Sequence, residues 1–115
     1  MYISSLSLKD FRNYKDAFIL FSRDLNIIYG NNAQGKTNII EAIFLCASGR
    51  SHRTAKDSEL VRINKNRFDI SLELFKGEGK KSIDIIYETG KKKMVKVNEI
   101  PVSRIGNLMG NLLAV

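Results

Sequence analysis

The 115-residue sequence has one cysteine, one proline and no tryptophan, and none of its hydrophobic runs approaches the roughly 18 residues needed to cross a bilayer. Cys46 has no second thiol with which to pair, and no CxxC or Cys/His cluster accompanies it, so neither an internal disulfide nor a zinc site is expected. The first strand-like segment already contains the charged Lys9, which argues against a secretory signal peptide. These absences predict a cytoplasmic chain that is stabilised by packing.

The composition is that of an ordinary globular protein, with 43% hydrophobic and 27% charged residues. The length allows one domain, or one piece of a domain. Because the sequence stops in the apolar run from Leu112 to Val115 with no polar tail, we expect it to be a truncated part of a longer protein.

The net charge of +7 is unevenly distributed along the chain. Residues 50–96 contain 13 basic and 7 acidic residues, a net charge of +6, so nearly all of the excess lies in the second half. This bias permits contact with a polyanion such as DNA. A lysine-rich solvated surface on strands would give the same composition.

Hydrophobic periodicity predicts several strands and few helices. Period-two alternation indicates strands, whereas apolar residues at a spacing of three and four indicate a helix packed against a core. The expected elements are a hairpin of strands 2–8 and 17–21 with its turn at 13–16, a buried strand 25–29, a helix 36–47 stopped by Gly49, a basic loop 50–56, a brief strand or turn 59–63, a hairpin of strands 68–74 and 83–87 turning at 77–79, a strand 93–98 and a short helix 103–109.

The strongest motif lies between the expected strand 25–29 and the expected helix. Its residues are Gly30, Asn31, Asn32, Ala33, Gln34, Gly35, Lys36 and Thr37, which match the phosphate-binding pattern G-x-x-x-x-G-K-[ST]. The glycines allow the backbone to curl around an anion, and the helix N-terminus adds free N–H groups and partial positive charge. We therefore predict that Lys36 contacts the β- and γ-phosphates of a nucleoside triphosphate, and that the Thr37 hydroxyl ligates Mg²⁺.

Triphosphate binding does not by itself imply hydrolysis. A P-loop enzyme also needs an acidic residue at the end of a buried strand and a group that orients the attacking water. No four-residue apolar run leads into an acid, and the segment Asp84 to Glu88 alternates like a half-exposed strand. The sequence therefore predicts binding and no complete catalytic site.

Three stretches resemble the RecF family of bacterial recombination mediators, whose members are similar to the ATPase heads of SMC proteins. These stretches are Lys9-Asp10-Phe11-Arg12-Asn13-Tyr14, the segment IIYGNNAQGKTNIIEAI, and Gly49-Arg50-Ser51-His52-Arg53-Thr54. The resemblance extends over the whole chain in the order of elements. It implies an α/β fold of the P-loop NTPase class, lobe I of an ABC/SMC-type head, with an antiparallel β-subdomain, a mixed sheet and few helices.

The resemblance also implies site residues and domain organisation. Arg12 and Asn13 would lie against the nucleotide near its ribose and phosphates, Arg53 would lie in a basic loop facing the nucleotide, and Asn38 would follow the phosphate-binding loop into the site. Residues 1–49 would form the P-loop layer, 50–100 the antiparallel subdomain, and 101–115 the start of the return to the core sheet. The sequence alone leaves a solvated turn open for Arg12, and a generic basic loop for Arg53.

In the RecF family, ATP with Mg²⁺ is sandwiched between two heads, and DNA binding is coupled to this dimerisation. The resemblance therefore implies a full-length homodimer that depends on ATP, DNA as a partner in single-stranded or junction form, recombination mediator proteins as further partners, and roles in replication, repair and the SOS response. The signature, second acidic and switch motifs of a complete member are absent from the sequence, so we expect hydrolysis only in the full-length protein.

Two other classes remain open. A P-loop GTPase or small-molecule kinase shares the loop, but no D-x-x-G follows it, and the run Asn64-Lys65-Asn66-Arg67 lacks the acid of N-K-x-D. A nucleotide-independent nucleic-acid-binding module would use Lys80, Lys81 and the lysines from Lys91 to Lys96 on phosphates, but it lacks interleaved aromatic residues for stacking bases.

Overall fold

The computed structural model describes residues 2–21, 33–48, 56–77 and 79–102, and within residues 33–36 it describes the backbone alone. In these ranges the elements are β1 (Tyr2–Phe11), β2 (Tyr14–Leu20), α1 (Ala33–Ser48), the 3-10 helix η1 (Asp57–Leu60), β3 (Arg67–Lys76), β4 (Gly79–Glu88), β5 (Met94–Val97) and β6 (Ile100–Pro101).

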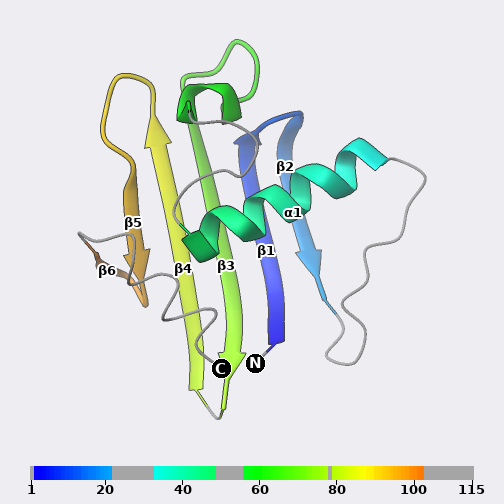
Figure 1. Ribbon diagram of the computed structural model, residues 1–115, viewed down its shortest axis with the longest axis vertical. Helices are drawn as coiled ribbons and strands as arrows, with labels where there is room; N and C mark the ends of the chain where they lie inside the picture. The colour runs from blue at the N-terminus through cyan, green and yellow to red at the C-terminus, as the bar shows by residue number, and fades with distance from the viewer. Residues whose placement is uncertain (1, 22–32, 49–55, 78, 103–115) are drawn as a thin grey trace.

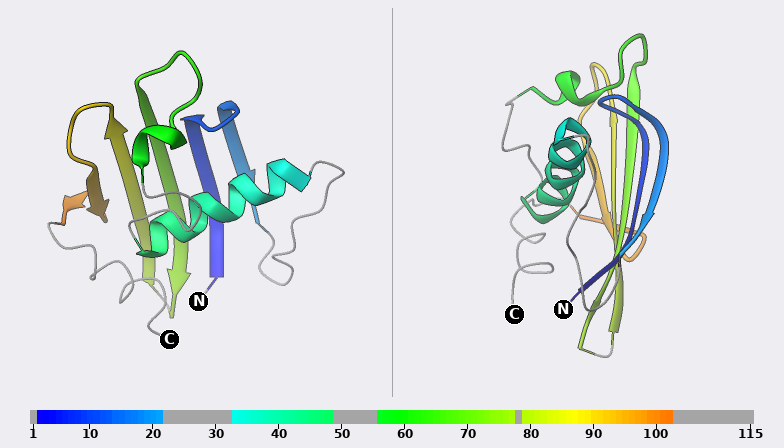
Figure 2. Two further views of the ribbon diagram at one scale, coloured as in Figure 1. Left: turned by 45° about the horizontal axis from the view of Figure 1, so that its top comes forward. Right: turned by 90° about the vertical axis from the view of Figure 1, so that its right-hand side faces the viewer.

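The described strands form one six-stranded antiparallel sheet in the order β2-β1-β3-β4-β5-β6. Helix α1 crosses one face of this sheet obliquely, and the opposite face carries no helix of the described residues (Figures 1 and 2). The two layers enclose the core. Its fully buried large side chains are Leu6, Leu8, Phe11, Leu45, Leu60, Phe68, Ile70, Leu72, Leu74, Ile83 and Ile85.

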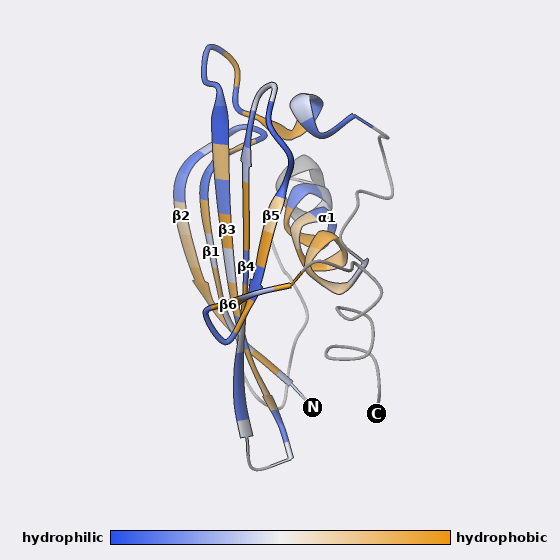
Figure 3. Ribbon diagram, turned by 90° about the vertical axis from the view of Figure 1, so that its left-hand side faces the viewer, coloured by the Kyte–Doolittle hydropathy of each residue, from blue (hydrophilic) through white to orange (hydrophobic). Residues whose placement is uncertain are grey.

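Alternation along the strands sets which face packs on the helix. In β3, Phe68, Ile70, Leu72 and Leu74 are buried, whereas the intervening polar residues are only half-buried. Successive strand side chains point to opposite faces, so one apolar row suffices to cover the core while the other row meets solvent. The alternation of hydrophilic and hydrophobic residues is visible along the strands in Figure 3. The two predicted hairpins and the predicted strand near residues 93–98 are therefore confirmed.

The turn of the first hairpin differs from the expectation. The sequence placed it at residues 13–16, but Phe11 pairs with Tyr14, so the connection is the dipeptide Arg12-Asn13 and β2 already begins at Tyr14. Arg12 has a φ of +54°, the left-handed conformation that tight two-residue hairpin turns demand. Such a φ is uncommon for arginine, which is why the sequence pattern did not indicate it.

Two further boundaries differ from expectation. The segment 59–63, expected as a brief strand or turn, begins with the last two residues of η1, and only then follow a bridge between Val61 and Phe11 and a turn at residue 63. Helix α1 begins at Ala33, three residues before the expected start at Lys36, since Ala33 and Gln34 are residue types that favour helix. The short strand β6 was not predicted.

Several predicted features lie outside the described residues. These are the strand 25–29, the stop at Gly49, most of the basic loop 50–56, the helix 103–109 and the apolar run that ends at Val115. Strands from both sides of residue 49 belong to the one described sheet, and the proposed division of the chain into three parts stays a prediction. None of the described helices is long and apolar enough to span a membrane.

Candidate functional site

The phosphate-binding motif meets the described structure at the start of α1. Gly30, Asn31 and Asn32 lie outside the described residues, and residues 33–36 are described as helical backbone. Thr37 is exposed in the second turn, and Asn38 beside it is buried with 2% of its surface exposed. The motif therefore runs directly into a helix, the context that binding of phosphates to free N–H groups requires.

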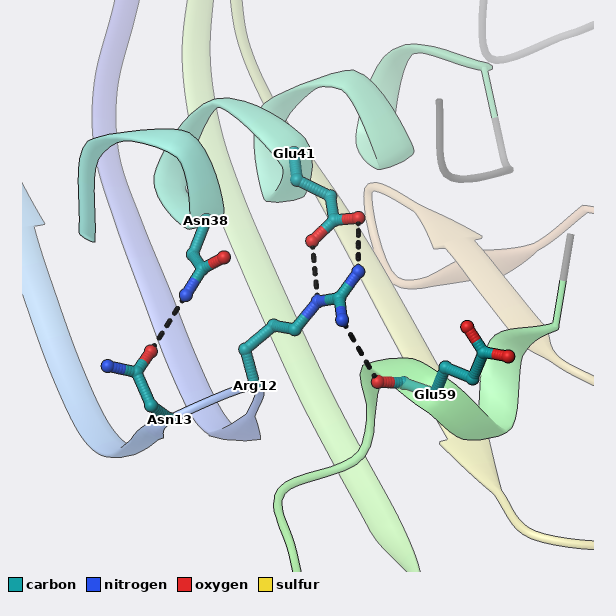
Figure 4. Close-up of polar contacts among 5 residues, drawn as sticks. All are labelled: Arg12, Asn13, Asn38, Glu41 and Glu59. Atoms are coloured by element: carbon teal, nitrogen blue, oxygen red, sulfur yellow. Dashed lines mark hydrogen bonds and ion pairs between the residues drawn. The ribbon is translucent and has the colours of Figure 1, made fainter. Parts of the chain in front are cut away.

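The turn between β1 and β2 is tied to α1 by a bidentate ion pair between Arg12 and Glu41 (Figure 4). Arg12 Nε donates to Glu41 Oε1 at 2.8 Å, and Arg12 Nη2 donates to Glu41 Oε2 at 2.8 Å. The Glu41 side chain is fully buried, and that of Arg12 is 21% exposed. A buried carboxylate requires such a partner because leaving its charge unpaired costs several kcal/mol.

Arg12 is also held from the opposite side by η1. Its Nη1 donates to the backbone carbonyl of Glu59 at 3.3 Å, and its own backbone N–H donates to the carbonyl of Leu60 at 2.7 Å. The N–H of Arg62 donates to the carbonyl of Asp10 at 2.8 Å. The end of β1 is thus bound to residues 60–62, and the guanidinium lies between α1 and η1 (Figure 4).

A second contact joins the same turn to the same helix. Asn38 Nδ2 donates to Asn13 Oδ1 at 2.8 Å. Asn38 and Glu41 are three residues apart on α1 and so lie on one face of the helix. The two consecutive turn residues Arg12 and Asn13 therefore contact two residues of α1 that follow the phosphate-binding motif in the sequence.

The electrostatics of the turn follow from these contacts. The hydrogen bonding of the Arg12 guanidinium to the Glu41 carboxylate raises the pKa of Arg12, against a smaller lowering by burial. Burial also raises the pKa of Tyr14, the first residue of β2. Arg12 is thus a permanent cation whose charge is largely matched by Glu41, and two of its five N–H donors remain after the three hydrogen bonds described above.

Sequence reasoning singled out Arg12, Asn13 and Asn38 and missed Glu41. The structure brings these four residues together (Figure 4). A signal for Glu41 was present: it is the one charged residue between Ile39 and Ser48, in a run otherwise apolar enough to be a core-facing helix. A carboxylate in such a run needs a cation nearby, but the sequence does not tell which of 19 basic residues supplies it.

The structure says less about the other residues that the sequence analysis considered. Arg53 and its neighbours Arg50 and His52 lie outside the described residues. Cys46 is fully buried in the core. Within the described residues no group of three His, Cys, Asp or Glu side chains could hold a metal ion.

The fold and the motif place the chain in a known class. A family model described as "AAA domain" matches residues 5–108, and the chain belongs to this family. The curated relatives include the "DNA replication and repair protein RecF" of Acetivibrio thermocellus, 69% identical over the whole chain, and that of Ruminiclostridium cellulolyticum, 52% identical. The resemblance to RecF is therefore confirmed. The chain spans about 31% of the length of each of these two relatives.

Solved structures agree with the sequence relatives. A structure of the recombination mediator protein RecF with ATP is 35% identical, with a TM-score of 0.85, covering 95% of this chain and 30% of that chain. The SMC head domain from Thermotoga maritima is 20% identical with a TM-score of 0.76, covering 96% of this chain and 42% of that one, and shows the shared fold alone. The fold is that of a P-loop NTPase head, as predicted, and these matches do not favour a GTPase, a kinase or a nucleotide-independent module.

Proposed function

We propose that this chain is the ATP-binding lobe of a RecF-like ATPase that acts on DNA in replication and recombinational repair. The observation that carries the proposal is the junction at the start of α1, where the motif ending in Lys36 and Thr37 enters the helix next to the turn that holds Arg12 and Asn13. The RecF relatives and the RecF structure with ATP support the choice of nucleotide and of process.

The roles of the site residues follow from the chemistry of P-loops. Backbone N–H groups from Gly30 to Gly35 would surround the phosphates, Lys36 would neutralise the β- and γ-phosphates, and Thr37 would ligate Mg²⁺. Thr37 is exposed, as a ligand to a metal that also touches the phosphates has to be. Asn38, Asn13 and Arg12 would complete the side of the site nearest the β1–β2 turn, and Arg53 would face the nucleotide from its basic loop.

Activity beyond nucleotide binding belongs to the full-length protein in this proposal. Hydrolysis would require the acidic, signature and switch motifs of a complete head. ATP-dependent homodimerisation, binding of single-stranded or junction DNA, contacts with recombination mediator proteins, a link to the SOS response and a cytoplasmic location all remain predictions from the RecF resemblance.

The lysines proposed to contact DNA fall into two groups. Lys80 and Lys81 lie near the start of β4, and Lys91 and Lys92 follow its end. The seven residues of β4 after Lys81 separate the two groups by roughly 23 Å along the strand. Lys56, Lys91, Lys92 and Lys93 line a hollow of about 740 Å³ with Asp57 and Tyr87. This second group is the denser one, and we propose it as the DNA contact.

The test of the central proposal is equilibrium binding of a fluorescent ATP analogue with Mg²⁺ to the purified chain. Lys36→Ala removes the charge that contacts the phosphates and should abolish binding, whereas unlabelled ATP should displace the analogue and GTP should compete poorly. Omission of Mg²⁺ should weaken binding if Thr37 is part of a metal site, and Thr37→Ala should then lose most of its sensitivity to Mg²⁺.

A matched control keeps the test specific. Lys65→Ala removes an exposed lysine far from α1 in sequence, with the same change in net charge, and should leave ATP binding unchanged. Binding by folded protein that is insensitive to Lys36→Ala, or equal competition by GTP, would contradict the proposal.

A further inference from the structure

The buried carboxylate of Glu41 has no role in the site as the phosphate-binding motif defines it. It lies four residues after Thr37 and three after Asn38, so all three share one face of α1. Both of its oxygens accept hydrogen bonds from the Arg12 guanidinium at 2.8 Å. The chain thus buries a charged group completely and directs both of its oxygens at the Arg12 guanidinium, next to the proposed ATP site.

A stability role alone does not account for this choice. A buried ion pair is frequently no more stabilising than apolar side chains of similar volume, because both charges lose their hydration. The flanking helix positions Ala42 and Leu45 are fully buried apolar residues, so an apolar residue at 41 would suit the local core. A bidentate pair does supply one thing that apolar packing cannot, which is a fixed direction for the guanidinium plane.

The direction of Arg12 is set further by its surroundings. Its backbone is fixed in the left-handed region, and Nη1 donates to the Glu59 carbonyl, so the two N–H donors that remain cannot turn freely. The exposure of 21% leaves this side chain accessible to a ligand. The hydrogen bond between Asn13 and Asn38 holds the adjoining residue of the turn against the same helix.

We propose that Glu41 is a positioning residue for ATP binding, which aims the remaining donors of Arg12 at the phosphates. The inference rests on the proposed function, because it assumes that ATP binds at the start of α1. Glu41 itself does not touch the nucleotide in this arrangement. It acts only through Arg12.

The proposal makes a prediction opposite in sign to that of simple electrostatics. Glu41→Gln removes a negative charge near the phosphate site, and Coulomb attraction alone would then tighten ATP binding. If Glu41 positions Arg12, the same change should weaken ATP binding by about tenfold, the loss expected when one charge-assisted hydrogen bond is no longer aimed. Glu41→Asp keeps the charge but withdraws the carboxylate, so it should weaken binding as well.

A double-mutant cycle separates positioning from a general loss of structure. Affinity for the fluorescent ATP analogue is measured for Arg12→Ala, Glu41→Gln and the double variant, with urea unfolding of each to correct for the folded fraction. We expect each single change to weaken binding by about tenfold and the double variant to bind no worse than Arg12→Ala. The double variant removes both charges together, so it leaves no unpaired buried charge and keeps the test valid if a single variant is poorly folded.

These binding measurements distinguish failure of the positioning role of Glu41 from failure of the proposed ATP-binding function. Tighter or unchanged binding by Glu41→Gln, with wild-type binding still dependent on Lys36, would overturn the positioning role alone. A loss caused by Glu41→Gln that persists in full without Arg12 would also overturn it. Absence of Lys36-dependent binding in the wild-type chain would instead overturn the proposed function, and the role of Glu41 with it.

Discussion

The ammonium group of Lys93 lies 3.0 Å and 3.1 Å from the two carboxylate oxygens of Asp57, so the segment between β4 and β5 is joined to η1. The Lys93 side chain is 11% exposed and that of Asp57 is 27% exposed, which distinguishes this pair from the solvated pairs on the sheet surface. Lys92, next to it in the sequence, is exposed. Of these two adjacent lysines, Lys93 is therefore held in an ion pair, whereas Lys92 extends into solvent.

The first prediction concerns stability. Lys93→Ala leaves Asp57 without its partner and should lower the free energy of unfolding by about 1 kcal/mol, a value reduced for the partial exposure of the carboxylate. Lys92→Ala has no such contact among the described residues and should change it by less than about 0.5 kcal/mol. Urea denaturation followed by circular dichroism measures both. Equal effects of the two substitutions would show that the ion pair contributes nothing.

The second prediction concerns DNA and reverses the order of these two lysines. Lys92→Glu should weaken binding of a DNA oligonucleotide and flatten the dependence of affinity on salt, because one fewer phosphate is neutralised. Lys93→Ala should leave DNA affinity of the folded protein unchanged, since the charge of Lys93 is already matched by Asp57. Fluorescence anisotropy at several salt concentrations provides the measurement. Unchanged affinity for Lys92→Glu would count against this surface.

The third prediction concerns the side-chain contact between the first hairpin and α1. Asn13→Ala removes the acceptor of the hydrogen bond from Asn38, whose amide is buried, and should lower the free energy of unfolding by about 1 kcal/mol. Asn13→Asp keeps an oxygen at the same position and should preserve stability. Thermal and urea unfolding compare the three proteins. A loss with aspartate as large as with alanine would show that the hydrogen bond is not the cause.

The parts of the fold that follow from local pattern could be predicted from the sequence. The alternation of Phe68, Ile70 and Leu72 with polar residues indicates β3, because the hydrophobic character of each residue alone predicts that its side chain is buried. The motif around Lys36 indicates the helix α1 for the same reason, since its chemistry is contained in consecutive residues. The strand 25–29 that it also indicates lies outside the described residues and stays a prediction.

The pairing of Arg12 with Glu41 could not be predicted in this way. The two residues are 29 positions apart, and their contact depends on how the first hairpin packs on α1. The turn was misplaced for a related reason: the positive φ of Arg12 is maintained by hydrogen bonds to Glu59 and Leu60, which lie far along the chain. Tertiary contacts override local preference at these positions.

The fourth prediction uses two glycines that flank the turn between β3 and β4. Gly77 has a φ of +63°, and a Cβ there would meet nothing within 4 Å, so the cost of Gly77→Ala is the backbone conformation alone. We expect a loss of roughly 1 kcal/mol. Gly79 has no positive φ, and its Cβ would lie 3.7 Å from the carbonyl of Lys76, an ordinary contact. Gly79→Ala should therefore be close to neutral, and similar losses at both positions would contradict the argument.

The fifth prediction uses Cys46 as a reporter of core opening. Its thiol is fully buried in α1, and burial raises its pKa well above the ordinary value. Because the thiolate is the reactive form, alkylation by iodoacetamide at pH 8 should be slow in the folded chain and should accelerate through the urea unfolding transition. Cys46 is the one cysteine of the sequence, so mass spectrometry assigns the label without ambiguity.

The raised pKa of Cys46 also determines whether the free energy of unfolding rises or falls with pH. Above roughly pH 8.5 the thiol of the unfolded chain ionises while the buried thiol of the folded chain keeps its proton, so the unfolded state binds fewer protons. The contribution of Cys46 to stability is therefore complete below that pH and is lost as the pH rises further, by at most about 1.4 kcal/mol per pH unit. Cys46→Ala should remove this part of the decline while lowering stability at pH 7. Equal slopes for both proteins between pH 8.5 and 10 would mean that the thiol is accessible to water in the folded chain.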